Sequence, residues 1–192
     1  MGLLVGAHFY LQKRERVAWL LAGPPPFPTA EDHGVILKDA TRMVIPVEVE
    51  LKCLAERQRD YPWPKPERCP RCQQCRVWGH GFVAVFFDGI PAAVYLKRFR
   101  CPSCRCVIRL RPKGYFRRFQ ASIACIYESL SRRIGYGSYL PGISRSRQRH
   151  WLRALQRQVA AYLGEGFRCR LLEGFLILSQ RGRVPVVSNL PF

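Results

Sequence analysis

Two short stretches of this 192-residue sequence, CPRCQQC at residues 69–75 and CPSCRC at residues 101–106, hold six of its nine cysteines. Each opens with the same Cys-Pro-x-Cys turn, which pairs Cys69 with Cys72 and Cys101 with Cys104. Two facing turns of this kind supply four thiolates in the tetrahedral arrangement that Zn²⁺ prefers. We therefore predict that these four cysteines bind one Zn²⁺.

The residues around the two turns predict a small antiparallel sheet. Apolar residues recur through RVWGHGFVAVF and AAVYLKRFR, the segments on either side of the turn FDGIP, and the strand-like CVIRLR follows the second cysteine pair. A cysteine turn, a hairpin, a second cysteine turn and a strand are the order of a zinc ribbon, which we place at residues 68–112. A site with four thiolates is saturated, so the predicted zinc is structural.

The other thiols leave two alternatives open. Cys72 and Cys75 have the same spacing, so Cys75 could replace Cys69, although the proline shared by CPRC and CPSC favours Cys69. His80, in the sequence WGHG, could replace a thiolate. We expect the remaining cysteines to be small buried residues: Cys53, Cys106, Cys125 and Cys169.

The segments outside the ribbon have their own patterns. Residues 1–60 predict a short amphipathic helix over residues 1–22 and then β-structure over residues 33–52, where Val47, Val49 and Leu51 alternate with charged residues. The proline-rich residues 61–67 form a linker. The C-terminal tail, residues 165–192, contains the apolar runs FLIL and VPVV, which could be strands.

A helical region is predicted over residues 113–164. Ile123, Ile126, Leu130 and Ile134 have helical spacing, and Gly135 is expected to end that helix. Ser144 is a suitable N-cap for a second helix, which has an apolar face and a basic face. A helix, a turn with glycine and a basic helix match a helix-turn-helix, so the fold class is α+β.

The charge distribution indicates a polyanionic partner. The formal net charge is +19, yet residues 1–68 hold ten Lys/Arg and nine Asp/Glu, while residues 69–192 hold 22 and four. Within residues 97–157 there are 16 Lys/Arg and Glu128 alone. Such a density favours nucleic acid as the partner, most simply duplex DNA. The short N-terminal apolar stretch predicts neither export nor a membrane span, and we expect a cytoplasmic protein.

The expected contacts fall into two groups. The second helix would enter the major groove, where arginine reads guanine and Gln148 or Gln156 could read adenine. Its expected contact residues are Arg145, Arg147, Gln148, Arg149, Arg153 and Arg157. Other basic residues would contact phosphates: Lys97, Arg98, Arg100, Arg109, Arg111, Lys113, Arg117 and Arg118. Three aromatic residues could stack on bases but more simply cover the junction between ribbon and helices: Tyr115, Phe116 and Phe119.

Five segments within roughly residues 66–163 carry a resemblance to a known family: CPRC, WGHG, RFRCPSC, a strand ending in LRP, and ISRSRQRHWL. Together they resemble the N-terminal zinc-ribbon and helix-turn-helix part of bacterial insertion-sequence transposases, and small stand-alone proteins of that type. The resemblance implies zinc ligation by the four cysteines and DNA recognition by residues 145–157. It also implies a nucleoid-associated role and a transposase or another mobile-element protein as a partner.

The sequence departs from that family after the helices. Such transposases continue into a catalytic domain with metal-binding acidic residues, whereas only Glu165 and Glu173 follow here. We therefore expect a DNA-binding protein without catalysis, acting as an accessory, a regulator or a remnant. The alternatives are an RNA-binding zinc ribbon and a protein–protein adaptor whose near-neutral residues 1–60 dock a partner.

Overall fold

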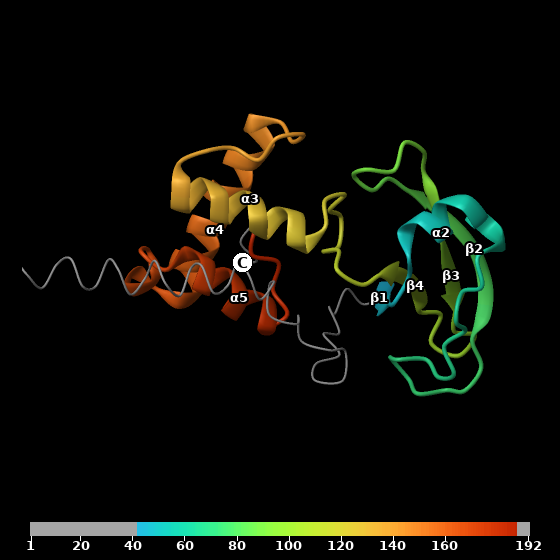
Figure 1. Cartoon of the computed structure of the whole chain (residues 1–192). Coiled ribbons are helices and arrows are strands. Elements are labelled where there is room, and N and C mark those ends of the chain that lie inside the picture. Colours follow the sequence, from blue (N-terminus) through green and yellow to red (C-terminus); the bar gives the residue numbers. More distant parts are fainter. Residues whose placement is uncertain (1–41, 188–192) are drawn as a thin grey trace, which may run out of the picture. The chain divides into compact units, whose positions relative to one another are not determined.

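The computed structural model describes residues 42–187, so the helix predicted over residues 1–22 lies outside the described part. The described chain is α+β, as predicted, with a four-stranded mixed sheet and the helices α2 to α5 (Figure 1). The predicted sheet had three strands. A strand from the N-terminal segment adds the fourth.

The three strands near the cysteine turns pair with one another in antiparallel orientation. They are β2 (Trp78–Val85), β3 (Val94–Arg100) and β4 (Val107–Pro112), at the places that the sequence predicted. Strand β1 (Arg42–Val47) pairs in parallel with β4, which gives the order β1-β4-β3-β2. These three strands are therefore part of a larger mixed sheet.

The expected strand over Val47, Val49 and Leu51 is wrong beyond Val47. Strand β1 ends there, and α2 (Leu51–Arg57) begins four residues later, followed by the 3₁₀ turn Gln58–Asp60. The side chain of Leu54 is fully buried in a cluster with Val94 and Leu96 of β3. Helical spacing brings Leu51 and Ala55 to the same cluster. Packing against β3 therefore makes this segment a helix, although its period-two pattern predicts a strand.

Two buried clusters lie on the sheet. One contains Val77, Phe99, Ile108 and Leu110 together with the cysteines of the two turns. The other contains Phe87, Val94 and Leu96 with Leu54 of α2. The strands that carry the turns are thus fixed by apolar packing.

Helix α3 (Ile123–Tyr136) begins as its sequence predicts and ends later. The side chain of its N-cap, Ser122, accepts a hydrogen bond from the backbone N–H of Cys125 at 3.1 Å. Gly135 lies inside the helix, and Gly137, with φ of 67°, provides the left-handed C-cap. The expected end at Gly135 is therefore wrong. The helix continues to Tyr136, and the next glycine, Gly137, adopts the positive φ of the cap.

Helix α4 (Arg145–Leu163) starts after Ser144, whose side chain accepts a hydrogen bond from Arg147 N, as predicted for a cap. After the short 3₁₀ turn Glu165–Phe167 comes α5 (Leu171–Gln180). The FLIL run lies in α5 and VPVV contains a turn, so neither forms a strand in the described part.

One core joins these three helices. Its buried members include Ile126 and Leu130 of α3, Trp151 and Leu155 of α4, and Phe175 of α5. FLIL is helical because Phe175 and Leu178, three positions apart, both face this core. The core leaves the opposite face of α4 outside the packing.

Candidate metal centre and basic surfaces

Four cysteine thiols meet at one end of the sheet. Trp78 of β2 lies opposite Arg100 of β3, so the turn before β2 and the turn after β3 are neighbours. The sulfur atoms of Cys69, Cys72, Cys101 and Cys104 all lie within 4.8 Å of one another. The Cys69–Cys104 and Cys72–Cys101 Sγ–Sγ distances are 3.6 and 3.5 Å. These four residues could bind one metal ion.

The distances fit tetrahedral coordination. With metal–sulfur bonds of about 2.3 Å, sulfur ligands at the corners of a tetrahedron lie about 3.8 Å apart. The Cys69–Cys104 and Cys72–Cys101 pairs are slightly nearer than this, and no pair is more than 4.8 Å apart, so binding needs little movement of the turns. Cys75, which is exposed, and His80 do not belong to the cluster.

The backbone explains why the pairs are Cys69 with Cys72 and Cys101 with Cys104. The residue after the second cysteine has a positive φ in both turns, 60° at Gln73 and 58° at Arg105. The N–H of Gln73 donates to the carbonyl of Cys69, which closes the first turn at 2.8 Å. Because both turns share this uncommon conformation, they are equivalent, and Cys75 takes no ligand position.

Backbone amides and burial act in opposite directions on the thiols. The N–H of Cys104 donates to the sulfur of Cys101, which lowers the pKa of Cys101 to about 6, while desolvation raises the pKa of Cys104 to about 12. The thiol of Cys104 therefore needs a bound cation to be deprotonated at neutral pH. Burial also raises the pKa of Cys106, which is a core thiol as predicted. Cys53 and Cys125 are half-buried, and Cys169 is exposed, so the prediction of a buried thiol is wrong for Cys169.

A row of arginines occupies the face of α4 opposite its core. Arg145, Arg149, Arg153 and Arg157 follow one another at intervals of four residues, and each is exposed. Gln156 is exposed as well. We call Arg145, Arg149, Arg153 and Arg157 the arginine row. The charged face that the sequence predicted is present.

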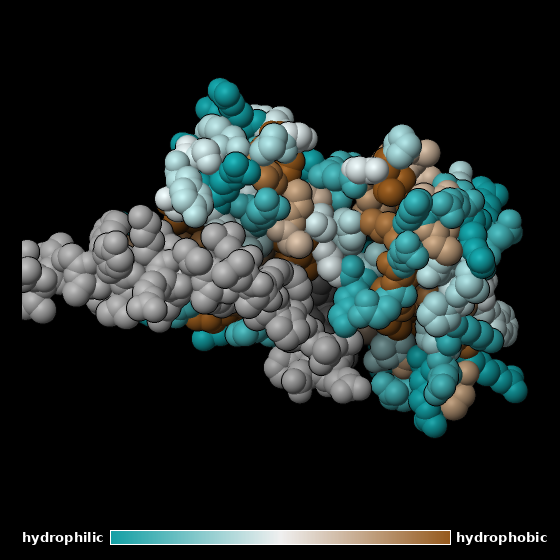
Figure 2. All heavy atoms as spheres, in the orientation of Figure 1, coloured by the Kyte–Doolittle hydropathy of each residue, from teal (hydrophilic) through white to brown (hydrophobic). Residues whose placement is uncertain are grey.

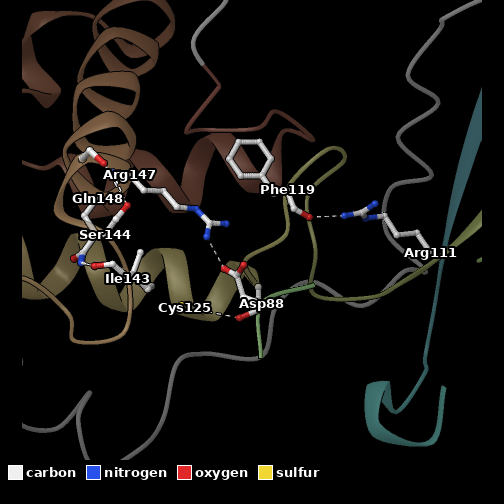
Figure 3. A network of polar contacts seen from close by, with 10 residues as sticks. Asp88, Arg111, Phe119, Cys125, Ile143, Ser144, Arg147 and Gln148 are labelled. Atoms are coloured by element: carbon white, nitrogen blue, oxygen red, sulfur yellow. Dashed lines mark hydrogen bonds and ion pairs between the residues drawn. The ribbon is translucent and has the colours of Figure 1, made fainter. Parts of the chain in front are cut away.

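Two expected contact residues on α4 are engaged within the protein instead (Figure 3). Gln148 is 1% exposed, and its carboxamide bonds to Ser129, to both backbone groups of Leu140 and to the Ile143 carbonyl. The prediction that Gln148 reads a base is therefore wrong for this conformation. Arg147 forms an ion pair with Asp88, with 2.8 Å between Nη1 and Oδ2.

The expected phosphate contacts on the sheet differ in accessibility. Arg100 and Arg118 are exposed, whereas Lys97 lies over the ring of Phe82 and Lys113 forms a 2.6 Å ion pair with Glu48. Arg111 is only 5% exposed and donates a 2.6 Å hydrogen bond to the carbonyl of Phe119. Arg111 is therefore not an open contact for a duplex backbone, and that prediction is wrong. In the view of Figure 2, hydrophilic side chains cover most of the described surface.

Five of these arginines line one cleft of about 540 Å³ together with Phe86 and Phe119. They are Arg98, Arg109, Arg111, Arg117 and Arg118, and we call this space the arginine cleft. No local sequence pattern predicts this cleft, because residues 117–120 reach the sheet only through the fold. By contrast, the sequence contains a signal for Asp88, the ion-pair partner of Arg147, because it is the one acidic residue between positions 69 and 127.

The three aromatic residues before α3 pack inside the protein. Tyr115 contacts Phe87, with ring centroids 4.6 Å apart, and Phe116 contacts Phe175 of α5 at 6.1 Å. Phe119 and Phe116 also join the helical core. They cover the junction, which is the simpler of the two interpretations of these residues.

Comparison of the chain with protein-family models, with curated proteins and with solved structures gave no match. The class that can be stated is an α+β protein with a four-cysteine cluster suited to one metal ion. No helix within residues 42–187 is both long enough and apolar enough to cross a membrane.

Proposed function

We propose that this chain is a zinc-stabilised DNA-binding protein without catalysis of its own. The observation that carries the proposal is the arginine row, four exposed guanidinium groups on one face of a helix whose other face is buried. Every member is separated from the next by about one helical turn, so the row runs along the helix as a continuous positive edge. Such an edge matches the negative charge of a phosphate backbone.

Zinc is the metal that the cluster suits best. Four thiolates are soft ligands, and a closed tetrahedral set of them is typical of structural zinc. In this role the ion would join the turn before β2 to the turn after β3, and its binding free energy would become folding free energy of the sheet. No open position would remain for a substrate.

The proposed mechanism has two steps. Exposed basic residues outside the cleft, such as Arg100, would attract the duplex and fix its position through phosphates, which adds affinity without sequence information. Helix α4 would then enter the major groove as the second helix of a helix-turn-helix formed with α3, and its arginines would read guanine. Gln156 is the glutamine available for adenine, since Gln148 is buried.

We place this activity in DNA transposition, on the resemblance to insertion-sequence transposases. The chain would act in the cytoplasm on the nucleoid, as an accessory, a regulator or a remnant that binds element ends. A transposase or another mobile-element protein would be its partner.

The test is selection from a random duplex library at about 0.15 M salt, with zinc-loaded and zinc-depleted protein, followed by affinity measurements on the enriched site. The variant Arg149→Ala/Arg153→Ala should bind that site at least tenfold more weakly, because two charge-assisted contacts are lost. The matched control is Arg132→Ala/Arg181→Ala, which removes the same charge from exposed positions outside α4. Equal losses in the two double variants would refute recognition by α4.

Single-stranded RNA is the second candidate, favoured by two exposed aromatic side chains. Trp78, at the start of β2, is 62% exposed, and Phe86, just beyond its end, is 56% exposed; β2 pairs with the basic strand β3. Exposed aromatic rings next to positive charge stack on unpaired bases. Competition between single-stranded RNA and duplex DNA of equal length separates this candidate from the first.

A further inference from the structure

The arginine cleft concentrates positive charge on one face of the sheet. Arg98 of β3 and Arg109 of β4 are direct cross-strand partners, and Arg111 follows two positions along β4 on the same face. Like charges directly opposite each other on a sheet destabilise it. Arg117 and Arg118 add two more cations from the chain after β4. None of the described lining residues is Asp or Glu.

Burial makes this concentration more costly. Arg111 is 5% exposed, and the Nε atoms of Arg98 and Arg111 are buried without a hydrogen-bond partner in the described chain. Desolvation, together with the charge of Arg109, lowers the pKa of Arg111 to about 10, so the group is still charged at neutral pH. A buried cation requires a compensating acceptor. The Phe119 carbonyl supplies only one, at 2.6 Å.

The cleft also has an aromatic wall. Phe86 lines it and is 56% exposed, which leaves its ring open to a planar ligand. The volume of about 540 Å³ lies in the range that small-molecule ligands occupy, roughly 300–1,000 Å³. A duplex, whose major groove alone is about 12 Å wide, cannot enter a space of this size.

We propose that the arginine cleft binds a nucleotide, with the arginines around its phosphate group and Phe86 against its base. Arginine is the side chain best suited to a phosphate, since its planar group donates two parallel hydrogen bonds to the phosphate oxygens. The bound anion would supply acceptors to Arg98 and Arg111, whose Nε atoms are buried without a hydrogen-bond partner in the described chain. This site is separate from the arginine row of α4 and does not depend on duplex binding there.

The same chemistry is offered by a free mononucleotide and by the phosphorylated end of a nucleic-acid strand. Isothermal titration of the full-length, metal-loaded protein at about 0.15 M salt tests both. The probes are adenosine 5′-monophosphate, inorganic phosphate, adenosine, and a short single strand with either a 5′-phosphate or a 5′-hydroxyl. A strand that binds only when phosphorylated, and more tightly than the mononucleotide, identifies the strand end as the source. Tighter binding of the mononucleotide than of the phosphorylated strand identifies the free nucleotide as the ligand.

Arg98→Gln/Arg118→Gln should weaken binding of the monophosphate at least tenfold, because two charge-assisted contacts are lost. Neither side chain makes a hydrogen bond on which the packing of α3 to α5 rests, so the variant is expected to fold. The matched control is Arg132→Gln, an exposed arginine of α3 outside the cleft, which should bind as the unchanged protein does. Phe86→Ala should weaken the binding of the monophosphate and leave the binding of inorganic phosphate unchanged.

Three results would overturn the proposal. Adenosine could bind as well as its monophosphate, Arg132→Gln could lose as much affinity per charge as the cleft variant, or no phosphate-bearing probe could bind at millimolar concentration. Loss of nucleotide binding in Arg98→Gln/Arg118→Gln with duplex affinity retained would separate this site from the proposed DNA-binding face. If Arg149→Ala/Arg153→Ala does not affect duplex binding, DNA recognition by α4 is refuted, whereas the proposal of nucleotide binding in the arginine cleft still stands.

Discussion

Gly174 of α5 lies directly against Val159 of α4. A Cβ atom placed on Gly174 would be 2.7 Å from Cγ2 of Val159 and 3.4 Å from Cδ1 of Leu163. Real Cβ atoms do not approach other carbons so closely, so only a glycine permits this contact between the two helices. We expect Gly174→Ala to lower the free energy of unfolding by about 1–3 kcal/mol through overpacking, as measured by chemical denaturation.

The control for this prediction is the same change in another helix. Gly135 lies inside α3, does not have a positive φ, and a Cβ there meets nothing within 4 Å. Gly135→Ala should therefore leave the protein as stable or stabilise it by up to about 1 kcal/mol, because alanine favours the helix. Destabilisation by both changes would contradict the close packing of α5 on α4.

Gln148 should behave as a structural residue. Its carboxamide takes part in four hydrogen bonds of 2.8–2.9 Å with Ser129, Leu140 and Ile143, which tie α4 to α3 and to the loop between them. Replacement by alanine leaves buried groups without partners, at about 1–3 kcal/mol for each group. Gln148→Ala is thus expected to lower the melting temperature strongly, while Gln156→Ala, on the exposed face, should leave it unchanged. An unaltered melting temperature in Gln148→Ala would argue against the network.

Cys101→Ser should abolish metal binding, and Cys75→Ser should not. The serine hydroxyl cannot replace a thiolate in a four-sulfur site, so the sheet loses the link between its two cysteine turns. Cys75 is exposed and outside the cluster. Metal content by native mass spectrometry checks both variants, and thermal melting with and without a chelator checks the effect on folding. Retention of one equivalent by Cys101→Ser would exclude the proposed ligand set.

The turn conformation predicts a strain effect at Arg105. This residue has a φ of 58°, where a β-branched side chain is strongly disfavoured, so Arg105→Val should cost about 1–3 kcal/mol of stability. Arg100→Val removes the same charge from an exposed position in β3, where valine is a good strand residue. Denaturation of both variants under saturating metal distinguishes backbone strain from loss of charge. Equal effects would mean that the left-handed conformation is not retained in solution.

Residue spacing predicted those parts of the fold that depend on neighbouring residues in the sequence. The strands between and after the cysteine turns, the cap at Ser144 and the apolar face of α4 all follow from residue spacing. The meeting of the four cysteines followed from two matched turns joined by a hairpin. For these elements, short-range geometry and burial agree, so the sequence alone is sufficient.

Contacts between distant residues decided the rest. The alternation of Val47, Val49 and Leu51 predicted a strand, but the burial of Leu54 against β3 selects a helix from Leu51 onward. FLIL is an apolar run of a length that suits either structure, and the helical core selected α5. Gln148 is the instructive error, because it lies three residues before Trp151 and seven before Leu155 and so shares their buried face. A polar residue within an apolar helical stripe is therefore a candidate for a buried hydrogen-bond network.

The parallel pairing of β1 with β4 has a consequence for the order of events during synthesis. Arg42 pairs with Val107, so β1 leaves the ribosome 65 residues before its partner exists, and the sheet cannot be completed until β4 has been made. Pairings so far apart in the chain form slowly. Meanwhile the unpaired edge of β1 can pair with other chains. The interval before β4 is covered is thus the stage at which chaperones and metal supply would most affect the yield of folded protein.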